Sequence, residues 1–230
     1  TGEPLTGRRF VLTLYPLSQM ELASVESAHE SEANLESRLL YGCYPEVVTA
    51  NGNASRKEYL TELMHSYLLK DILEIEGVRH SDKLVRTLQL IAFQIGREVS
   101  LTELGTQLAM SKNTVERYVD LLEKVFVLKR LMPFSRNLRK EVSKSHRLYF
   151  CDNGVRNALI GNFNPLALRN DDGQLWENFI VMERMKRNEY RLEIAQSYFW
   201  RTYDKKEIDL VEERDGALHG YEIKLSEKRG

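Results

Sequence analysis

Residues 100–125 read SLTELGTQLAMSKNTVERYVDLLEKV and carry the clearest structural signal in the chain. Ser100, followed three residues later by Glu103, is a capping box that predicts the start of a short helix. Residues 110–113 predict a tight turn, and Ser111 is the expected N-cap of the next, longer helix. A short helix, a tight turn and a longer helix form the helix-turn-helix pattern.

The segments on either side extend this pattern. Lys83–Ile95 predicts a preceding helix, because its apolar residues recur at helical spacing. Phe126–Pro133 and Arg147–Cys151 predict two strands around a loop rich in Arg and Lys. These elements together predict a winged helix-turn-helix over residues 81–150. The expected core residues are Leu84, Leu88, Ile91, Ala92 and Ile95 in the first helix and Val115, Tyr118, Val119 and Leu122 in the last.

Positive charge is concentrated in the same region. The formal net charge of the chain is −1, but residues 81–150 contain 13 Lys and Arg against 7 Asp and Glu. Basic segments bind nucleic acids by neutralising phosphates and releasing counterions. In a winged helix the second helix of the motif enters the major groove, and the wing contacts the backbone. The expected nucleic-acid contacts are Lys112, Asn113, Arg117, Arg136, Arg139, Lys140 and Lys144.

Two alternatives to nucleic-acid binding stay open at this point. A basic stretch is often a solvated surface without a partner, and winged helices also serve as protein-interaction modules. Glu116 and Asp120 lie on the same predicted helix as the candidate contacts and oppose tight binding to a phosphate backbone. Binding that weakens with salt and with substitutions in the wing would favour nucleic acid.

The residues before the winged helix are expected to be mainly helical. Residues 7–17 alternate like a strand that ends at Pro16, without an evident partner strand nearby. Residues 18–80 show helical spacing, interrupted by Gly, Pro and Asn. No apolar run approaches the roughly 20 residues of a membrane span, and no export signal is recognisable, so a cytoplasmic protein is expected. Cys43 and Cys151 are expected to be buried, without a disulfide or a zinc site.

One helix and three strands are expected after residue 170. The helix is predicted over Leu175–Met185, and the strands over Ser197–Thr202, Glu207–Glu213 and Ala217–Leu225. Asp215-Gly216 between the last two strands is a strong hairpin signal. The predicted fold class is therefore mixed α+β, with a helical N-terminal segment, a winged helix and an α/β C-terminal domain.

Charged residues interrupt the last two predicted strands. Glu222 and Lys224 share one strand face, and Asp209 lies between apolar residues on the preceding strand. Such charges are costly on a sheet unless they are paired or bind a metal. Asp209 and Glu222 are candidate ligands of Mg²⁺, which prefers oxygen, with Lys224 beside it. The alternatives, a Glu222–Lys224 surface pair and an ion pair of Asp209 with Arg201 or Lys224, stay open.

Together with Glu177 on the preceding helix, these residues resemble the signature of the PD-(D/E)xK nucleases. The match consists of Glu177, Asp209 and Glu222-Ile223-Lys224, within about residues 170–225. The resemblance implies that Asp209 and Glu222 hold Mg²⁺ and that Lys224 and Glu177 act in catalysis. That fold continues with a further helix and strand, so the resemblance predicts an incomplete nuclease-like domain here.

Six further motifs resemble a group of bacterial and archaeal ATP-binding proteins. They are Tyr15-Pro16-Leu17-Ser18, Gly42-Cys43-Tyr44-Pro45-Glu46, Lys70-Asp71-Ile72, Phe134-Ser135-Arg136-Asn137, Asp152-Asn153-Gly154 and Trp176-Glu177-Asn178-Phe179. In that group an AAA+-type P-loop ATPase domain precedes a winged helix and a nuclease-like domain. The 230 residues contain no Gly-x-x-x-x-Gly-Lys-Ser/Thr segment, so no ATP-binding residue is expected among them. ATP is expected only in a missing N-terminal domain.

The expected domains follow from these patterns. Residues 1–17 are interpreted as a remnant strand of the ATPase domain, 18–80 as a helical segment, 81–150 as the winged helix and 151–230 as the nuclease-like domain. The expected function is a DNA-acting arm of an ATPase with a Mg²⁺-dependent nuclease-like site. A non-catalytic DNA-binding or regulatory arm is the alternative. DNA and the protein's own ATPase domain are the expected partners, a membrane is not, and a homo-oligomer is left open.

Overall fold

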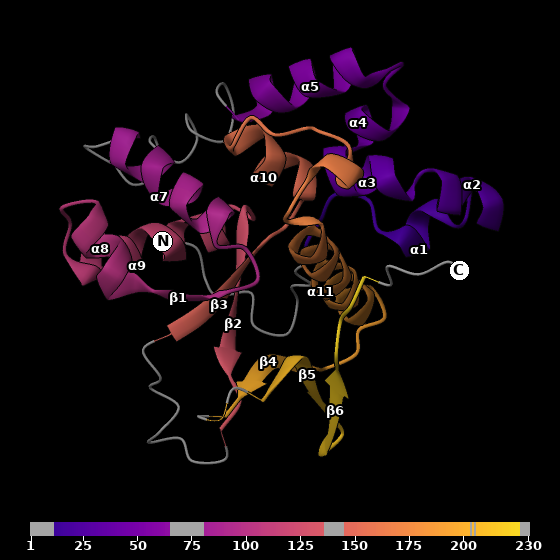
Figure 1. The fold of residues 1–230 in the computed structure, drawn as a ribbon. Coiled ribbons are helices and arrows are strands. Elements are labelled where there is room, and N and C mark those ends of the chain that lie inside the picture. Colours follow the sequence, from indigo (N-terminus) through magenta and orange to yellow (C-terminus); the bar gives the residue numbers. More distant parts are fainter. Residues whose placement is uncertain (1–11, 65–80, 136–144, 203, 205, 226–230) are drawn as a thin grey trace, which may run out of the picture.

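The structure is a computed structural model that describes residues 12–64, 81–135, 145–202, 204 and 206–225 (Figure 1). The fold contains a six-stranded sheet with the strand order β1-β3-β2-β4-β5-β6, and in Figure 1 the labelled helices lie above β4, β5 and β6. The pairing of β2 with β4 is parallel and the other pairings are antiparallel. The predicted mixed α+β class is therefore confirmed. Among the described residues, no helix is long and apolar enough to cross a membrane.

Short helices make up the N-terminal segment, as predicted. They are α1 (Gln19–Leu22), α2 (Ala28–Ala33), α3 (Leu35–Tyr41), α4 (Pro45–Thr49) and α5 (Asn53–Glu62). The strand predicted over residues 7–17 is wrong for residues 12–17, which form no strand, and residues 7–11 lie outside the described residues. Leu12 and Leu14 are largely exposed there. The N–H of Leu17 donates a hydrogen bond to the Cys43 carbonyl at 2.8 Å. Strand pairing requires a series of such backbone bonds, so this contact does not form a strand.

The middle region contains the helices predicted from its periodicity. Its elements are α7 (Ser81–Phe93), β1 (Glu98–Ser100), α8 (Leu101–Gln107), α9 (Lys112–Lys124), β2 (Leu128–Pro133) and β3 (Ser145–Phe150). All nine predicted core residues of its helices are buried. The Ser111 hydroxyl accepts a hydrogen bond from the N–H of Thr114 at 3.1 Å, so this predicted N-cap is confirmed.

The predicted capping box is only half formed. The Ser100 hydroxyl accepts a hydrogen bond from the N–H of Glu103 at 3.3 Å, but the Glu103 carboxylate accepts none from the Ser100 N–H. Ser100 is also the last residue of β1, a strand that the sequence analysis did not predict, and it pairs with Ser145 in β3. Its backbone therefore belongs to the sheet as well as to the helix start.

The C-terminal region has the predicted order of a helix and three strands. It contains α10 (Asn153–Leu159), the 3₁₀ turn η2 (Leu166–Leu168), α11 (Asp172–Tyr190), β4 (Gln196–Arg201), β5 (Glu207–Arg214) and β6 (Ala217–Tyr221). Asp215 and Gly216 both have positive φ, which confirms the hairpin between β5 and β6. The strand predicted to reach Leu225 ends earlier, at Tyr221. Beyond it, the N–H of Ile223 donates to the Asp209 carboxylate at 2.8 Å instead of to a backbone carbonyl.

One continuous sheet joins the middle and C-terminal regions. Met132 and Pro133 of β2 pair with Tyr198 and Phe199 of β4, and the N–H of Phe134 donates to the Phe199 carbonyl at 2.6 Å. Helix α11 lies beside β3 on this sheet (Figure 1). This packing brings side chains from β3, β5 and α11 to the same place.

Three of the motifs quoted for the ATP-binding group meet in the interior. The Asp152 carboxylate accepts hydrogen bonds from the N–H groups of Cys43 (2.7 Å) and Gly154 (2.8 Å) and caps α10. Asn178 on α11 bonds both the N–H and the carbonyl of Phe150. The motifs therefore hold α3, α10, α11 and β3 together. Cys43 and Cys151 are buried free thiols, as predicted.

Candidate functional site

Four residues singled out by the nuclease resemblance line one pocket of about 380 Å³. These are Glu177, Asp209, Glu222 and Lys224, and the acidic residues Asp172 and Glu207 line the same pocket. Glu177 comes from α11, Asp209 from β5, and Glu222 and Lys224 from the segment after β6. The structure thus brings together side chains that are up to 47 residues apart in sequence.

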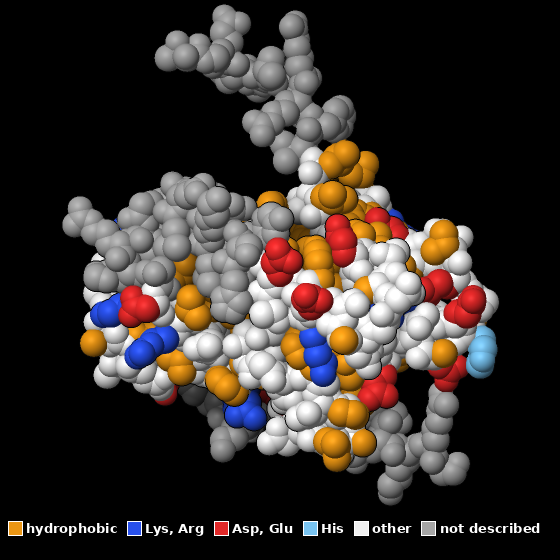
Figure 2. Space-filling view, turned by 90° about the horizontal axis from the view of Figure 1, so that it is seen from above, with side chains coloured by type: hydrophobic (Ala, Val, Ile, Leu, Met, Phe, Trp, Pro, Cys, Tyr) orange, Lys and Arg blue, Asp and Glu red, His pale blue; other side chains and the backbone are white. Residues whose placement is uncertain are grey.

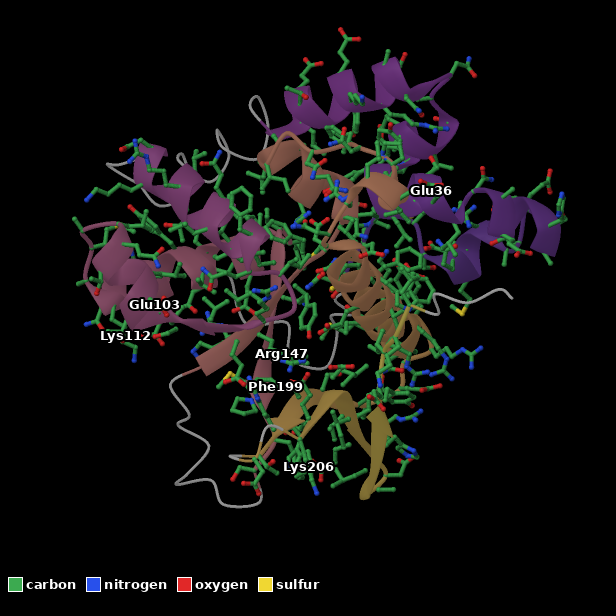
Figure 3. The ribbon with its side chains drawn as sticks, viewed as in Figure 1. Glu36, Glu103, Lys112, Arg147, Phe199 and Lys206 are labelled. Carbon is green, nitrogen blue, oxygen red and sulfur yellow. The ribbon has the colours of Figure 1, made fainter. Side chains whose placement is uncertain are left out.

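Arg147 of β3 reaches the carboxylates from the other side. Its guanidinium lies 2.8 Å from Glu207, 3.3 Å from Asp209 and 3.4 Å from Glu177. Its Cζ atom also lies 5.0 Å from the centre of the Phe199 ring, and Figure 3 shows these two side chains side by side below α11. The Arg147 side chain is 4% exposed, so its charge lies in the interior. The alternative partners considered for Asp209 were Arg201 and Lys224, whereas the structure pairs it with Arg147.

Tyr149 and Gly96 complete the surroundings of Glu177. The Tyr149 hydroxyl donates to Glu177 Oε1 at 2.7 Å. Gly96 has a φ of 72°, and a Cβ added there would lie 3.1 Å from Glu177 Oε2. Arg147 and Tyr149 are two apart on β3, so they share one face of the strand. This alternation was the sequence signal that placed both residues on one strand face, but it did not identify their carboxylate partners.

Glu222 and Lys224 lie at the exposed rim of the pocket. Lys224 Nζ is 2.6 Å from Glu222 Oε1, and both side chains are mostly in solvent. The surface pair considered as an alternative for these two residues is thus present. Such an exposed pair contributes only about 0–1 kcal/mol to stability and leaves both groups free to change partner.

The candidate nucleic-acid contacts fall into two groups. Lys112, Asn113 and Arg117 are exposed on α9, and Figure 3 shows Lys112 far from Arg147. Arg136, Arg139, Lys140 and Lys144 lie outside the described residues. Arg130 is paired with Asp120 and Glu123.

The face seen in Figure 2 differs from the surface expected for α9 and the wing. On its described part, acidic, basic and hydrophobic side chains are interspersed. A polyanion is held best where positive charges gather. On the described part of the face in Figure 2, positive charges do not gather in this way.

Comparison with protein-family models shows to which family the chain belongs. Residues 32–166, more than half of its length, match the model of a domain of unknown function, DUF8612. The chain belongs to the DUF8612 family. Residues 172–230 match a second domain of unknown function, DUF4143, which is found in the C-terminal regions of AAA-type ATPases. Glu177 and Asp209, which line the pocket of this DUF8612-family chain, lie in the second matched region, and Arg147, which pairs with both, lies in the first.

Relatives of this DUF8612-family chain are longer proteins. It is 30% identical over 226 residues to uncharacterized proteins of Mycobacterium bovis and Mycobacterium tuberculosis, which covers 97% of the chain and 48% of each relative. It is 25% identical over 217 residues to an uncharacterized protein of Haemophilus influenzae, covering 90% of the chain and 51% of that relative. The chain therefore spans about half the length of these curated relatives. No solved structure gave a significant match.

Glu177 makes the stability of the metal-free protein depend on pH. Burial raises the pKa of this carboxyl from its ordinary 4.5 to about 7; the Tyr149 hydroxyl acts in the opposite direction, Asp209 and Glu207 reinforce the rise, and Arg147 opposes it. Between these two pKa values the folded chain holds a proton that the unfolded chain has released. The stabilisation from this group is therefore complete below about pH 4.5 and is lost as the pH rises through 7.

We expect the free energy of unfolding in EDTA to fall by roughly 2–3 kcal/mol between about pH 4.5 and pH 7.5, relative to Glu177→Gln. Urea denaturation across this range measures both proteins, and the Gln variant cannot titrate. Parallel pH profiles for the two proteins would contradict the prediction.

Proposed function

We propose that this chain is the DNA-acting part of a larger ATP-linked protein, and that its carboxylate pocket hydrolyses phosphodiester bonds with the help of Mg²⁺. One observation carries the proposal: Glu177, Asp209, Glu222 and Lys224, which come from three different segments, line the same pocket. Sequence resemblance to PD-(D/E)xK nucleases selected these four residues without reference to the pocket. Their convergence supports a shared chemical role.

The middle region supplies the proposed DNA-binding module. The order α7-β1-α8-α9-β2-β3, with the three strands in one sheet, supports the interpretation of this region as a winged helix. Helix α9 would enter the major groove, where the exposed Lys112, Asn113 and Arg117 face base edges and phosphates. The basic residues of the wing would contact the backbone.

The pocket has the donor chemistry that Mg²⁺ requires. Among the described residues, no group of three or more His, Cys, Asp or Glu is arranged to hold a metal ion. Mg²⁺, however, is commonly held by one or two carboxylates and several waters. Asp209 and Glu222 would hold it, and the ion would supply a Lewis acid beside the phosphodiester.

The chain's own side chains have distinct roles in this proposal. Lys224 at the rim would stabilise negative charge on the phosphate, since it is exposed and only surface-paired. Glu177 would accept or release a proton near neutral pH, because its pKa is about 7. Tyr149 and Arg147 would position Glu177 through the contacts described above.

The link to ATP comes from the DUF4143 match and from the greater length of the relatives. An AAA+-type P-loop domain in the remaining half would use ATP to control access to DNA. Within the 230 residues no phosphate-binding loop is present. In this proposal, the remaining half of the longer protein hydrolyses ATP and the 230 residues of this chain contact DNA.

Calorimetric titration with Mg²⁺ and Mn²⁺ tests the metal site. We expect binding by the parent chain, no detectable binding by Asp209→Ala, and binding at least about tenfold weaker in Glu222→Ala, because each change removes a ligand. Glu58→Ala, which removes an exposed carboxylate outside the pocket, is the control and should bind like the parent. If the folded parent protein binds neither Mg²⁺ nor Mn²⁺, the proposal of metal-dependent hydrolysis is rejected.

A second candidate function is a non-catalytic DNA-binding or regulatory arm. It is favoured by Arg147, whose guanidinium forms ion pairs with Asp209 and Glu177 within the protein itself. In this case the carboxylates are structural, and DNA binding persists unchanged in Asp209→Ala. Cleavage of linear and branched DNA that requires Asp209 would exclude this second function.

A further inference from the structure

A second pocket lies next to the carboxylate pocket. Its volume is about 240 Å³, and its lining combines three side-chain amides, two arginines, one carboxylate and an aromatic ring: Asn162, Asn170, Gln174, Arg97, Arg156, Asp171 and Phe93. Gln174 lines both pockets. Gly96 stands between them, because its neighbours Ile95 and Arg97 line the second pocket while its own Cα faces the Glu177 carboxylate. The two pockets are therefore adjacent.

The polar groups of this second pocket are held differently from those of the first. Arg156 is buried at its base and donates to Asp171 (2.5 Å) and to the Ala92 carbonyl (2.9 Å). This pairing joins α10 to α7 and to the start of α11 and makes the base rigid. At the mouth, in contrast, the Arg97 side chain forms no hydrogen bond or ion pair with the described part of the chain. It is a cation available to a ligand.

An exposed aromatic ring stands beside this arginine. Phe93, the last residue of α7, is 65% exposed, whereas the other apolar residues lining the pocket are at least partly buried. An exposed phenyl ring gains free energy by stacking on a flat apolar face. Side-chain amides present one donor group and one acceptor group, which match the edges of nucleobases. Arg97 matches a phosphate.

We propose that this second pocket binds an unpaired nucleotide of the DNA substrate, with its base against Phe93, its edge against the amides of Asn170 and Gln174, and its phosphate against Arg97. The inference rests on the proposed function and names its substrate class: DNA with single-stranded nucleotides beside the cleaved bond. A base inside a duplex cannot enter such a pocket, because its faces are stacked and its edge is paired. Duplex bound by α9 would thus continue as single strand over the two pockets.

Fluorescence anisotropy in EDTA tests this pocket separately from the metal site. The full chain is titrated against a labelled blunt duplex and against the same duplex with a single-stranded overhang. We expect the overhang duplex to bind about tenfold more tightly, and the double variant Phe93→Ala/Arg97→Gln to lose that preference, since stacking on an aromatic ring and one phosphate contact are removed. Affinity for the blunt duplex should change by less than about threefold.

The matched control is Arg191→Gln/Leu192→Ala. It also removes one exposed cation and one exposed apolar side chain, at the far end of α11. Equal weakening in both double variants, or no preference for the overhang in the parent, would overturn the nucleotide pocket. If the parent chain prefers the overhang duplex but does not bind Mg²⁺, the nucleotide pocket is supported and the hydrolysis proposal is rejected. Circular dichroism confirms that both variants are folded.

Discussion

Replacing Arg147 with Met is expected to lower the free energy of unfolding by about 3–5 kcal/mol at pH 8. The guanidinium is 4% exposed and lies within 3.4 Å of both Asp209 and Glu177, whose side chains are themselves mostly buried. Met fills most of the vacated volume but leaves two partly buried carboxylates without a cation. Breaking a buried pair from one side is costly because the remaining charge cannot regain its hydration. Urea denaturation measures the loss.

Two further variants test whether the loss of stability comes from the buried ion pairs of Arg147. Arg201→Met is the matched control, because Arg201 pairs with Glu98 and Glu207 in more exposed positions, and its loss should cost at most about 1 kcal/mol. The double variant Arg147→Met/Asp209→Asn should recover part of the lost stability, because it removes one uncompensated charge. A loss in Arg147→Met no larger than in Arg201→Met would show that the carboxylates do not depend on this cation.

The second large effect is expected from Gly154→Ala. A Cβ at residue 154 would lie closer to the backbone carbonyl oxygen of Tyr41 than the 3.0 Å that Cβ atoms normally keep. Because the obstacle is backbone, either α3 or α10 must move. Forcing atoms into a well-packed interior costs about 3 kcal/mol or more in such cases. We expect a correspondingly lower midpoint of urea denaturation.

Gly173→Ala is the control, because an added Cβ there should not destabilise the protein. A Cβ there meets no atom within 4 Å, and the residue lies in the first turn of α11. The substitution should therefore raise the free energy of unfolding by up to about 1 kcal/mol, since it restricts the unfolded chain. If both substitutions destabilise the protein equally, close packing of α3 on α10 is not the reason for Gly154.

These two effects explain why the quoted motifs consist of these residue types. Gly154 permits the backbone of α10 to approach α3, and Asp152 then satisfies N–H groups on both sides of that contact. Asn178 ties α11 to β3, and its neighbour Glu177 is thereby held over the pocket. The motifs carried by the family resemblance are thus mainly a scaffold, and the candidate site is built on its surface.

Local elements of the fold were predictable from the sequence. The nine core positions in and directly after α7 and in α9, the N-cap at Ser111 and the Asp215-Gly216 hairpin depend on side chains and backbone within about four residues of one another. The four residues of the carboxylate pocket were predicted as well, since alternation and the family resemblance pointed to them. The end of β6 at Tyr221 was not predictable, because it depends on a hydrogen bond to Asp209.

By itself, the sequence determined the mixed α+β class, the helices of the middle region and three of the carboxylates that line the pocket, Glu177, Asp209 and Glu222. Only the tertiary structure decided that Arg147 and Tyr149 of β3 contact the carboxylates of this pocket and that Phe93 and Arg97 line the pocket next to it. The physical reason is the sequence distance over which each interaction acts. Periodicity and capping involve residues that are close in sequence. A buried ion pair forms where sheet pairing and helix packing bring distant charges together, and a local sequence pattern does not show this contact.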